Sequence, residues 1–96
     1  MPAEAPVVSV ILPFFNAQST LERAIESIAS QSFGNFECIL INNNSTDISV
    51  EIARRWTEKD RRFVLVQEEI QGVMYASNTG SKLSRGRYIA RMDADD

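Results

Sequence analysis

The chain has 96 residues, of which 44% are hydrophobic and 24% are charged, which predicts one small soluble globular domain. Its formal net charge of −3 gives no electrostatic reason to expect nucleic acid as a partner. With one cysteine, Cys38, and no histidine, the chain can form no internal disulfide, no zinc site of the usual Cys/His kind and no Ser-His-Asp triad. Cys38 lies in an apolar run, so we expect a buried, unreactive thiol.

We find neither a signal peptide nor an apolar run long enough to cross a membrane. We therefore expect a cytoplasmic protein, whose full-length form would lie peripherally at the inner face of the membrane. The five basic residues between Arg54 and Arg62 alternate with acidic ones, a pattern typical of the solvated face of a helix.

The first part of the chain predicts a strand followed by a helix. Residues 1–6 contain two prolines and are expected to form a flexible lead-in. The β-branched run Val7–Leu12 is typical of a strand buried on both faces, and Pro13 is expected to end it. Ser19 followed by Glu22 resembles a capping box that opens a helix. One apolar stripe at helical spacing follows, consisting of Leu21, Ala24, Ile25, Ile28 and Ala29.

The rest of the chain repeats this plan. Strands are predicted at Phe36–Ile41, Phe63–Val66 and Arg87–Met92. A helix with N-cap candidates Ser45, Thr46 and Asp47 should bury Ile48, Ile52, Ala53 and Trp56. A further helix after Gly72 should turn Val73, Ala76, Gly80 and Leu83 inward, and its small residues would allow a close approach to the sheet.

The order β-α-β-α-β-α-β with short connections predicts an α/β, Rossmann-like fold with a mostly parallel four-stranded sheet. In such sheets ligands bind beyond the carboxyl ends of the strands. Three polar loops follow strands here, at residues 13–16, 42–47 and 93–96. We expect all three to face one crevice.

The loop chemistry suits a nucleotide diphosphate held with a divalent cation. Asp93, Asp95 and Asp96 are close enough to repel one another unless a cation or solvent screens them, and Mg²⁺ or Mn²⁺ prefers such hard oxygen ligands. The alternative is a solvated acidic tail. Likewise, Phe14 and Phe15 are either binding residues or core residues, and residues 42–47 are either a binding loop or only a turn and helix cap. No glycine-rich phosphate loop of either common kind is present.

Four motifs in order resemble glycosyltransferase family 2, with the GT-A fold. These are the P-F-F-N loop after the first strand, the N-N-N-S-T-D loop, the stretch G-V-M-Y-A-S-N-T-G and the D-A-D-D end. The resemblance runs from about Val7 to Asp96 and implies the N-terminal, nucleotide-sugar-binding half of a GT-A domain. It implies an inverting, metal-dependent transfer of a sugar from a nucleotide-diphospho-sugar, commonly UDP-linked, in polysaccharide biosynthesis.

By the same resemblance, individual residues acquire expected roles. Asp95 would bind the Mg²⁺ or Mn²⁺ that bridges the diphosphate, and Asp93 would contact the ribose or support the metal. The nucleoside pocket would be lined by Pro13, Phe15, Asn16, Asn43 and Ser45. Two departures from the family pattern concern this assignment: Asn42-Asn43-Asn44-Ser45 stands where relatives most often read D-D-G-S, and Ser77 stands where an arginine is common.

The family's general base and acceptor site lie after its D-x-D signature. We therefore expect a chain truncated after this motif, with no catalytic residue of its own, inactive alone and with an unknown saccharide, lipid-linked or other acceptor. The fourth strand would then have an open edge, through which we expect self-association.

Three other kinds of protein share some of these features. A sugar nucleotidyltransferase would need a glycine-rich basic loop after the first strand, and a receiver domain would need acids after the first and third strands. The sequence is also compatible with a non-catalytic nucleotide-binding α/β module.

Overall fold

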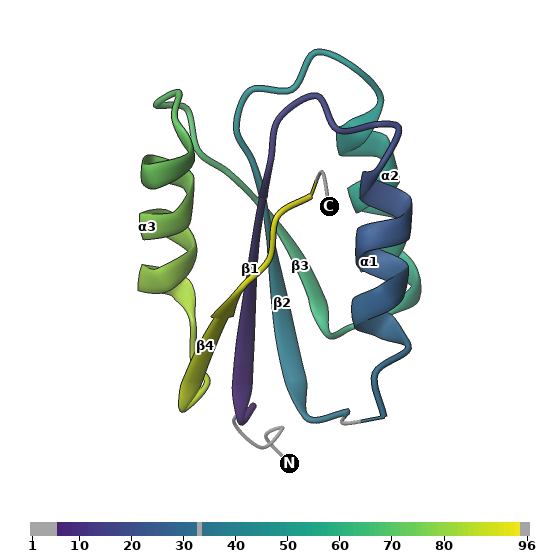
Figure 1. The fold of residues 1–96 in the computed structure, drawn as a ribbon, viewed down its shortest axis with the longest axis vertical. Coiled ribbons are helices and arrows are strands. Elements are labelled where there is room, and N and C mark those ends of the chain that lie inside the picture. The colour runs from purple at the N-terminus through teal and green to yellow at the C-terminus, as the bar shows by residue number, and fades with distance from the viewer. Residues whose placement is uncertain (1–5, 33, 95–96) are drawn as a thin grey trace.

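The structure, a computed structural model, describes residues 6–32 and 34–94. Four strands alternate with three helices in the predicted order (Figure 1). The elements are β1 (Val8–Phe14), α1 (Leu21–Ala29), β2 (Phe36–Asn42), α2 (Ser49–Lys59), β3 (Phe63–Gln67), α3 (Val73–Leu83) and β4 (Tyr88–Arg91). Of the predicted lead-in, residues 1–5 lie outside the described residues, and Pro6 is buried.

The strands form one parallel sheet in the order β3-β2-β1-β4. Helices α1 and α2 cover one face of this sheet, and α3 covers the other face (Figure 1). The predicted α/β, Rossmann-like fold with a parallel four-stranded sheet is thereby confirmed. All four strands point the same way, so their carboxyl ends lie at one edge of the sheet.

The core has two parts because alternate residues of a strand face opposite sides. Leu12, Phe14, Cys38 and Leu40 pack with α1 and α2, whereas Ile11, Ile39 and Ile41 pack with Ala76 of α3. The two central strands are thus apolar on both faces, which explains their continuous apolar sequences.

β1 extends beyond its predicted end, through Pro13 to Phe14. On the side of β1 that faces β4, the Ile11 carbonyl accepts a hydrogen bond from the Met92 N–H. On the side that faces β2, the Phe14 carbonyl accepts one from the Asn43 N–H. By alternation, the backbone nitrogen of Pro13 faces the β4 side, where strand pairing has already ended at Ile11 and Arg91. The missing N–H of proline therefore costs the sheet no hydrogen bond, and the prediction that Pro13 ends the strand was wrong.

The inner face of α3 is narrower than predicted. Ala76 and Gly80 are buried, but Val73 and Leu83 are each half exposed, so their assignment to the inner face was wrong. The helix lies so close to the sheet that a Cβ at Gly80 would stand 2.6 Å from Ile11 Cγ2. Because the helix lies this close to the sheet, only small residues such as Ala76 and Gly80 fit between them.

The helix starts also differ from the capping predictions. α1 begins after Thr20 without a side-chain cap, so the Ser19 capping box was wrong. The Glu22 carboxylate instead accepts a hydrogen bond of 2.7 Å from Trp56 Nε1, which ties α1 to α2. α2 begins after Ile48, although Asp47 Oδ1 still accepts from the Ser49 N–H at 2.9 Å.

The structure also bears on the predicted burial of Cys38 and on the search for a membrane-spanning segment. Cys38 is fully buried, as predicted, and burial together with the charges of Asp60 and Glu37 raises the pKa of its thiol far above the usual range. None of the helices in the described part is long and apolar enough to span a bilayer.

Candidate functional site

A crevice opens at the carboxyl ends of the strands. It consists of two adjoining cavities of about 230 and 360 Å³ that share Pro13, Phe14, Phe15 and Val73. Asn43 and Gln71 line the smaller cavity, and Arg91, Asp93 and Ala94 line the larger one. Four residues singled out from the sequence, Pro13, Phe15, Asn43 and Asp93, therefore meet in one place. Asn16 and Ser45 line neither cavity.

The two aromatic residues at the end of β1, Phe14 and Phe15, lie in different environments. Phe14 is 3% exposed and belongs to the core, whereas Phe15 is 52% exposed and lies at the crevice. An exposed ring beside polar groups offers a flat apolar surface for a planar ligand.

Asn16 and Ser45 fasten two loops of the crevice to each other. The Asn16 N–H donates to Ser45 Oγ at 2.9 Å, and the Thr46 N–H donates to Asn16 Oδ1 at 2.7 Å. Asn16 adopts φ 48°, a left-handed conformation that asparagine tolerates better than most residues. These hydrogen bonds hold the loop after β1 against the loop after β2. Asn16 and Ser45 therefore position the residues that line the crevice without lining it themselves.

Asp47 adds a third connection between the same loops. Its Oδ2 accepts from the Gln18 N–H at 3.2 Å. Desolvation acts to raise the pKa of Asp47, but the hydrogen bonds from Ser49 and Gln18 outweigh it and lower the pKa below its ordinary value.

Asn43 is the most constrained polar residue at the crevice. It is 3% exposed, and its Nδ2 donates to the carbonyl oxygens of Glu68 and Ile70, both at 2.9 Å. Its Oδ1 accepts from the Gly72 N–H at 2.8 Å and, more weakly, from Gln71 Nε2 at 3.4 Å. The amide thereby uses both of its donor hydrogens and holds the loop between β3 and α3 in place.

The acidic end is only partly described. Asp93 is exposed, and the one ion pair given for it is with Arg91 Nη2 at 3.8 Å. The predicted metal ligand Asp95, and Asp96 with it, lie outside the described residues. Within residues 6–32 and 34–94 no three acidic, cysteine or histidine side chains gather as a metal site. Asp93 nevertheless fits a hard cation, because Mg²⁺ and Mn²⁺ use one or two carboxylates together with phosphate oxygens.

Sequence reasoning missed Gln71, Val73 and Arg91, which also line the crevice. The loop after β3 carries Glu68, Glu69 and Gln71, but the prediction of candidate binding loops included only those after β1, β2 and β4. The rule that ligands bind at the carboxyl ends of parallel strands applies to β3 as well, and would have included Gln71.

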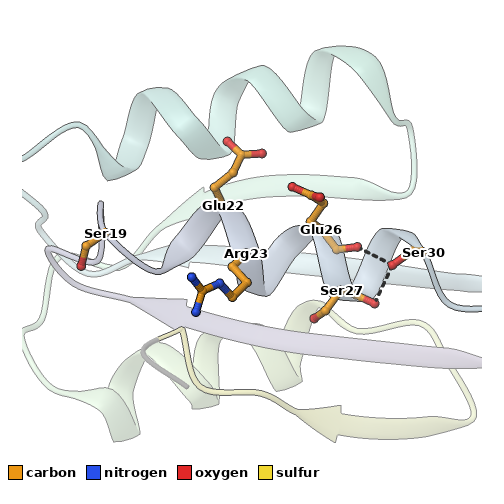
Figure 2. Close-up of a pocket in the computed structure, with 6 residues that line it drawn as sticks. All are labelled: Ser19, Glu22, Arg23, Glu26, Ser27 and Ser30. Carbon is orange, nitrogen blue, oxygen red and sulfur yellow. Dashed lines mark hydrogen bonds between the residues drawn. The ribbon is translucent and has the colours of Figure 1, made fainter.

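A second hollow, of about 510 Å³, lies along α1 and its flanking residues (Figure 2). All its lining side chains come from Ser19 to Ser30 of this one segment, and Ser30 Oγ donates back to the Glu26 carbonyl. It is the open surface of one helix, where no second element converges, and we assign it no site.

The sequence model of Glycosyl transferase family 2 matches residues 9–96. The chain belongs to this family. It is 34% identical over 93 residues to the putative glycosyltransferase EpsH of Bacillus subtilis, covering 97% of this chain and 27% of EpsH. It is 35% identical over 89 residues to the glycosyltransferase GlyA of Streptococcus pneumoniae, covering 93% of this chain and 13% of GlyA.

Solved structures agree with the family assignment. The chain superimposes on S. aureus TarS 1-349 with a TM-score of 0.85 at 27% identity, covering 93% of this chain and 27% of TarS 1-349. It superimposes on the mannosyltransferase PcManGT of Pyrobaculum calidifontis, in complex with GDP-Man and Mn²⁺, with a TM-score of 0.86 at 29% identity, covering 96% and 28%. The chain thus spans about a quarter of EpsH and of these two structures, and 13% of GlyA, and it has the GT-A architecture in that part.

Proposed function

We propose that residues 7–96 form the donor-binding part of an inverting, metal-dependent glycosyltransferase that uses a nucleotide-diphospho-sugar. The observation that carries the proposal is the single crevice in which an exposed ring, two amides and a carboxylate converge, namely Phe15, Asn43, Gln71 and Asp93. Relatives of known structure have been solved with such donors, TarS with UDP-GlcNAc and PcManGT with GDP-Man and Mn²⁺, and TarS also with the nucleotide UDP.

The ring of Phe15 would support the nucleobase in the smaller cavity, and Asp93 would face the ribose or the metal in the larger one. Because the buried Asn43 amide is already committed to the loop before α3, the exposed amide of Gln71 is the more readily exchanged partner for a base. We keep Asn43 as a lining residue that shapes the pocket.

A bound Mg²⁺ or Mn²⁺, held by Asp93 and Asp95, would supply positive charge that stabilises the departing diphosphate. We assign no general base to the described residues that line the crevice, and we propose that the base, and the residues that select the acceptor, lie outside residues 7–96. The buried free thiol of Cys38 suits a reducing compartment, and we propose the cytoplasm.

Calorimetric titration of UDP into the protein, with and without Mn²⁺, tests this proposal. We expect UDP binding that requires Mn²⁺ and is lost in Asp93→Ala and in Asp95→Ala. Glu58→Ala, which removes an exposed carboxylate of α2, is the matched control and should bind as the unchanged protein does. GDP and CDP titrated in parallel identify the base. Failure of every nucleoside diphosphate to bind would contradict the donor-site assignment.

A further inference from the structure

Four residues form a polar network at the end of the sheet opposite the crevice. Ser9 and Glu37 are register partners on β1 and β2, and they are 0% and 7% exposed. The Glu37 carboxylate accepts from Ser9 Oγ at 2.6 Å, from the Arg85 N–H at 2.6 Å and from Arg85 Nε at 3.1 Å. Ser9 Oγ in turn accepts from the Gly86 N–H at 2.8 Å. We call Ser9, Glu37, Arg85 and Gly86 the polar lock.

The polar lock binds the connection between α3 and β4. It holds two successive backbone N–H groups, of Arg85 and Gly86, immediately before β4 begins at Tyr88. Charge-assisted hydrogen bonds of this length to a buried carboxylate are directional and stronger than neutral ones. The start of β4 is therefore attached to β1 and β2 by contacts that depend on where the backbone atoms lie.

β4 itself has little side-chain packing to determine its register. Its four residues are all exposed, and it pairs with β1 alone within the described part of the chain. Register is weakly specified where neither face of a strand is buried. Sliding β4 by two residues keeps every side chain on its own face but moves Asp93 by roughly 6.6 Å along the strand.

Gly86 makes the polar lock selective for one register. A Cβ at this position would lie 2.7 Å from the Ser9 backbone nitrogen and 2.8 Å from Ser9 Oγ, too close for any side chain. A two-residue slip in either direction would bring Ser84 or Tyr88 to this place, and both carry a Cβ. The slipped registers are thus excluded by sterics, and they also lose the hydrogen bonds to Glu37.

We propose that Glu37, acting through this polar lock, is a positioning residue that sets the register of β4 and so places Asp93 in the crevice. The other anchor of this segment is at its far end, where Ala94 is buried and the Met92 N–H donates to the Ile11 carbonyl at 3.0 Å. The polar lock fixes the segment before β4, and the Met92–Ile11 hydrogen bond together with the buried Ala94 holds the segment after it. The consequence for donor binding rests on the proposed function, whereas the register itself does not.

The charged groups around Glu37 come from two connections. Arg85 contacts it directly, and Arg61 and Arg62 line the same cavity of about 270 Å³. The Arg62 guanidinium is paired with Asp60, at 2.7 Å. Within the described residues, the ion pair given for Glu37 is with Arg85, whose Nε lies 3.1 Å from Glu37 Oε1.

Nuclear magnetic resonance of Glu37→Gln and Gly86→Ala tests the proposal, with Glu58→Gln as a control on an exposed carboxylate. Amide exchange is followed at Tyr88 and Met92, whose N–H groups donate to the carbonyls of Val7 and Ile11, and at Leu40 of the central strand β2. We expect exchange at Tyr88 and Met92 to become roughly tenfold faster or more in both variants while Leu40 stays protected. The cross-strand contact of Val8 with Tyr88 should weaken as β4 loses its native pairing with β1.

Titration of Mn²⁺ and UDP into the same variants links the register to donor binding. We expect the affinity of the variants for UDP in the presence of Mn²⁺ to fall roughly tenfold, because only the fraction of molecules with the native β4 register binds. Unchanged Val8–Tyr88 contacts and exchange in both variants would overturn the proposal. If Glu37→Gln does not fold, Ser9→Ala and Arg85→Ala, which each remove part of the polar lock, take its place. If no nucleoside diphosphate binds any of the proteins, the proposed function fails while the register result still stands.

Discussion

Replacing Gly80 by alanine sets two opposing effects against each other in α3. Alanine is favoured over glycine in a helix interior by about 1 kcal/mol. The added Cβ, however, would stand 2.6 Å from Ile11 Cγ2 and 2.9 Å from Ile41 Cδ1, and both isoleucines are buried in the core. Overpacking of a tight core costs about 1–3 kcal/mol. We therefore expect a net destabilisation of about 1 kcal/mol.

Urea denaturation followed by Trp56 fluorescence measures this change in the free energy of unfolding. In thermal unfolding a loss of about 1 kcal/mol corresponds to a Tm lower by roughly 4–8 °C for a domain of this size. The variants Ser81→Ala and Ser81→Gly, at the exposed neighbouring position, measure the alanine-to-glycine difference of the same helix without the steric term. Subtracting this difference isolates the cost of the contact.

Combining Gly80→Ala with Ile41→Val provides a second check. The valine lacks the Cδ1 that would stand 2.9 Å from the new Cβ, so the alanine should cost less in this background. If Gly80→Ala instead stabilises the protein by as much as the Ser81 pair predicts, the close approach of α3 to the sheet is refuted.

Other consequences can be measured on the same protein. Cys38 should not react with a thiol reagent in the folded protein and should react fully in denaturant, because its thiol is buried and its pKa is raised; fast labelling of the folded protein would contradict this. Glu22→Ala should destabilise by about 1 kcal/mol, since it leaves the Trp56 indole N–H unpaired, whereas the neighbouring Glu26→Ala should have little effect. Desolvation raises the pKa of Glu37, but the bonds from Ser9 and Arg85 outweigh it and lower the pKa below its ordinary value. The stabilisation that the ionised Glu37 carboxylate gives is therefore complete above the ordinary pKa of a glutamate and is lost as the pH falls through the lower, folded-state pKa. Glu37→Gln should remove this part of the dependence of unfolding free energy on pH. An unchanged pH dependence in this variant would contradict the lowered pKa. Light scattering at high concentration should show self-association through the open edge of β4, and a clean monomer would contradict it.

Much of the fold follows from local sequence patterns. Continuous apolar runs at Val7–Leu12 and Phe36–Ile41 identify strands covered on both faces, and the alternation of strands with amphipathic helices requires parallel pairing with helices on both sides. Parallel pairing in turn brings the loops after the strands to one edge. For that reason the sequence alone groups the loops at residues 13–16, 42–47 and 93–96, and the family resemblance then names residues within them. Of these, Pro13, Phe15, Asn43 and Asp93 line the crevice, whereas Asn16 and Ser45 do not.

Only the tertiary structure decided which partners the polar side chains take. Glu22 was expected to cap its own helix but binds Trp56 of α2, and Asn43 binds a loop almost thirty residues away. A capping motif describes what a side chain can reach locally, and a competing partner brought near by folding is invisible in the local sequence. The same holds for Ser9 and Glu37: nothing in either strand's sequence shows that the two residues meet Arg85 and Gly86, because these contacts exist only once β4 lies beside β1.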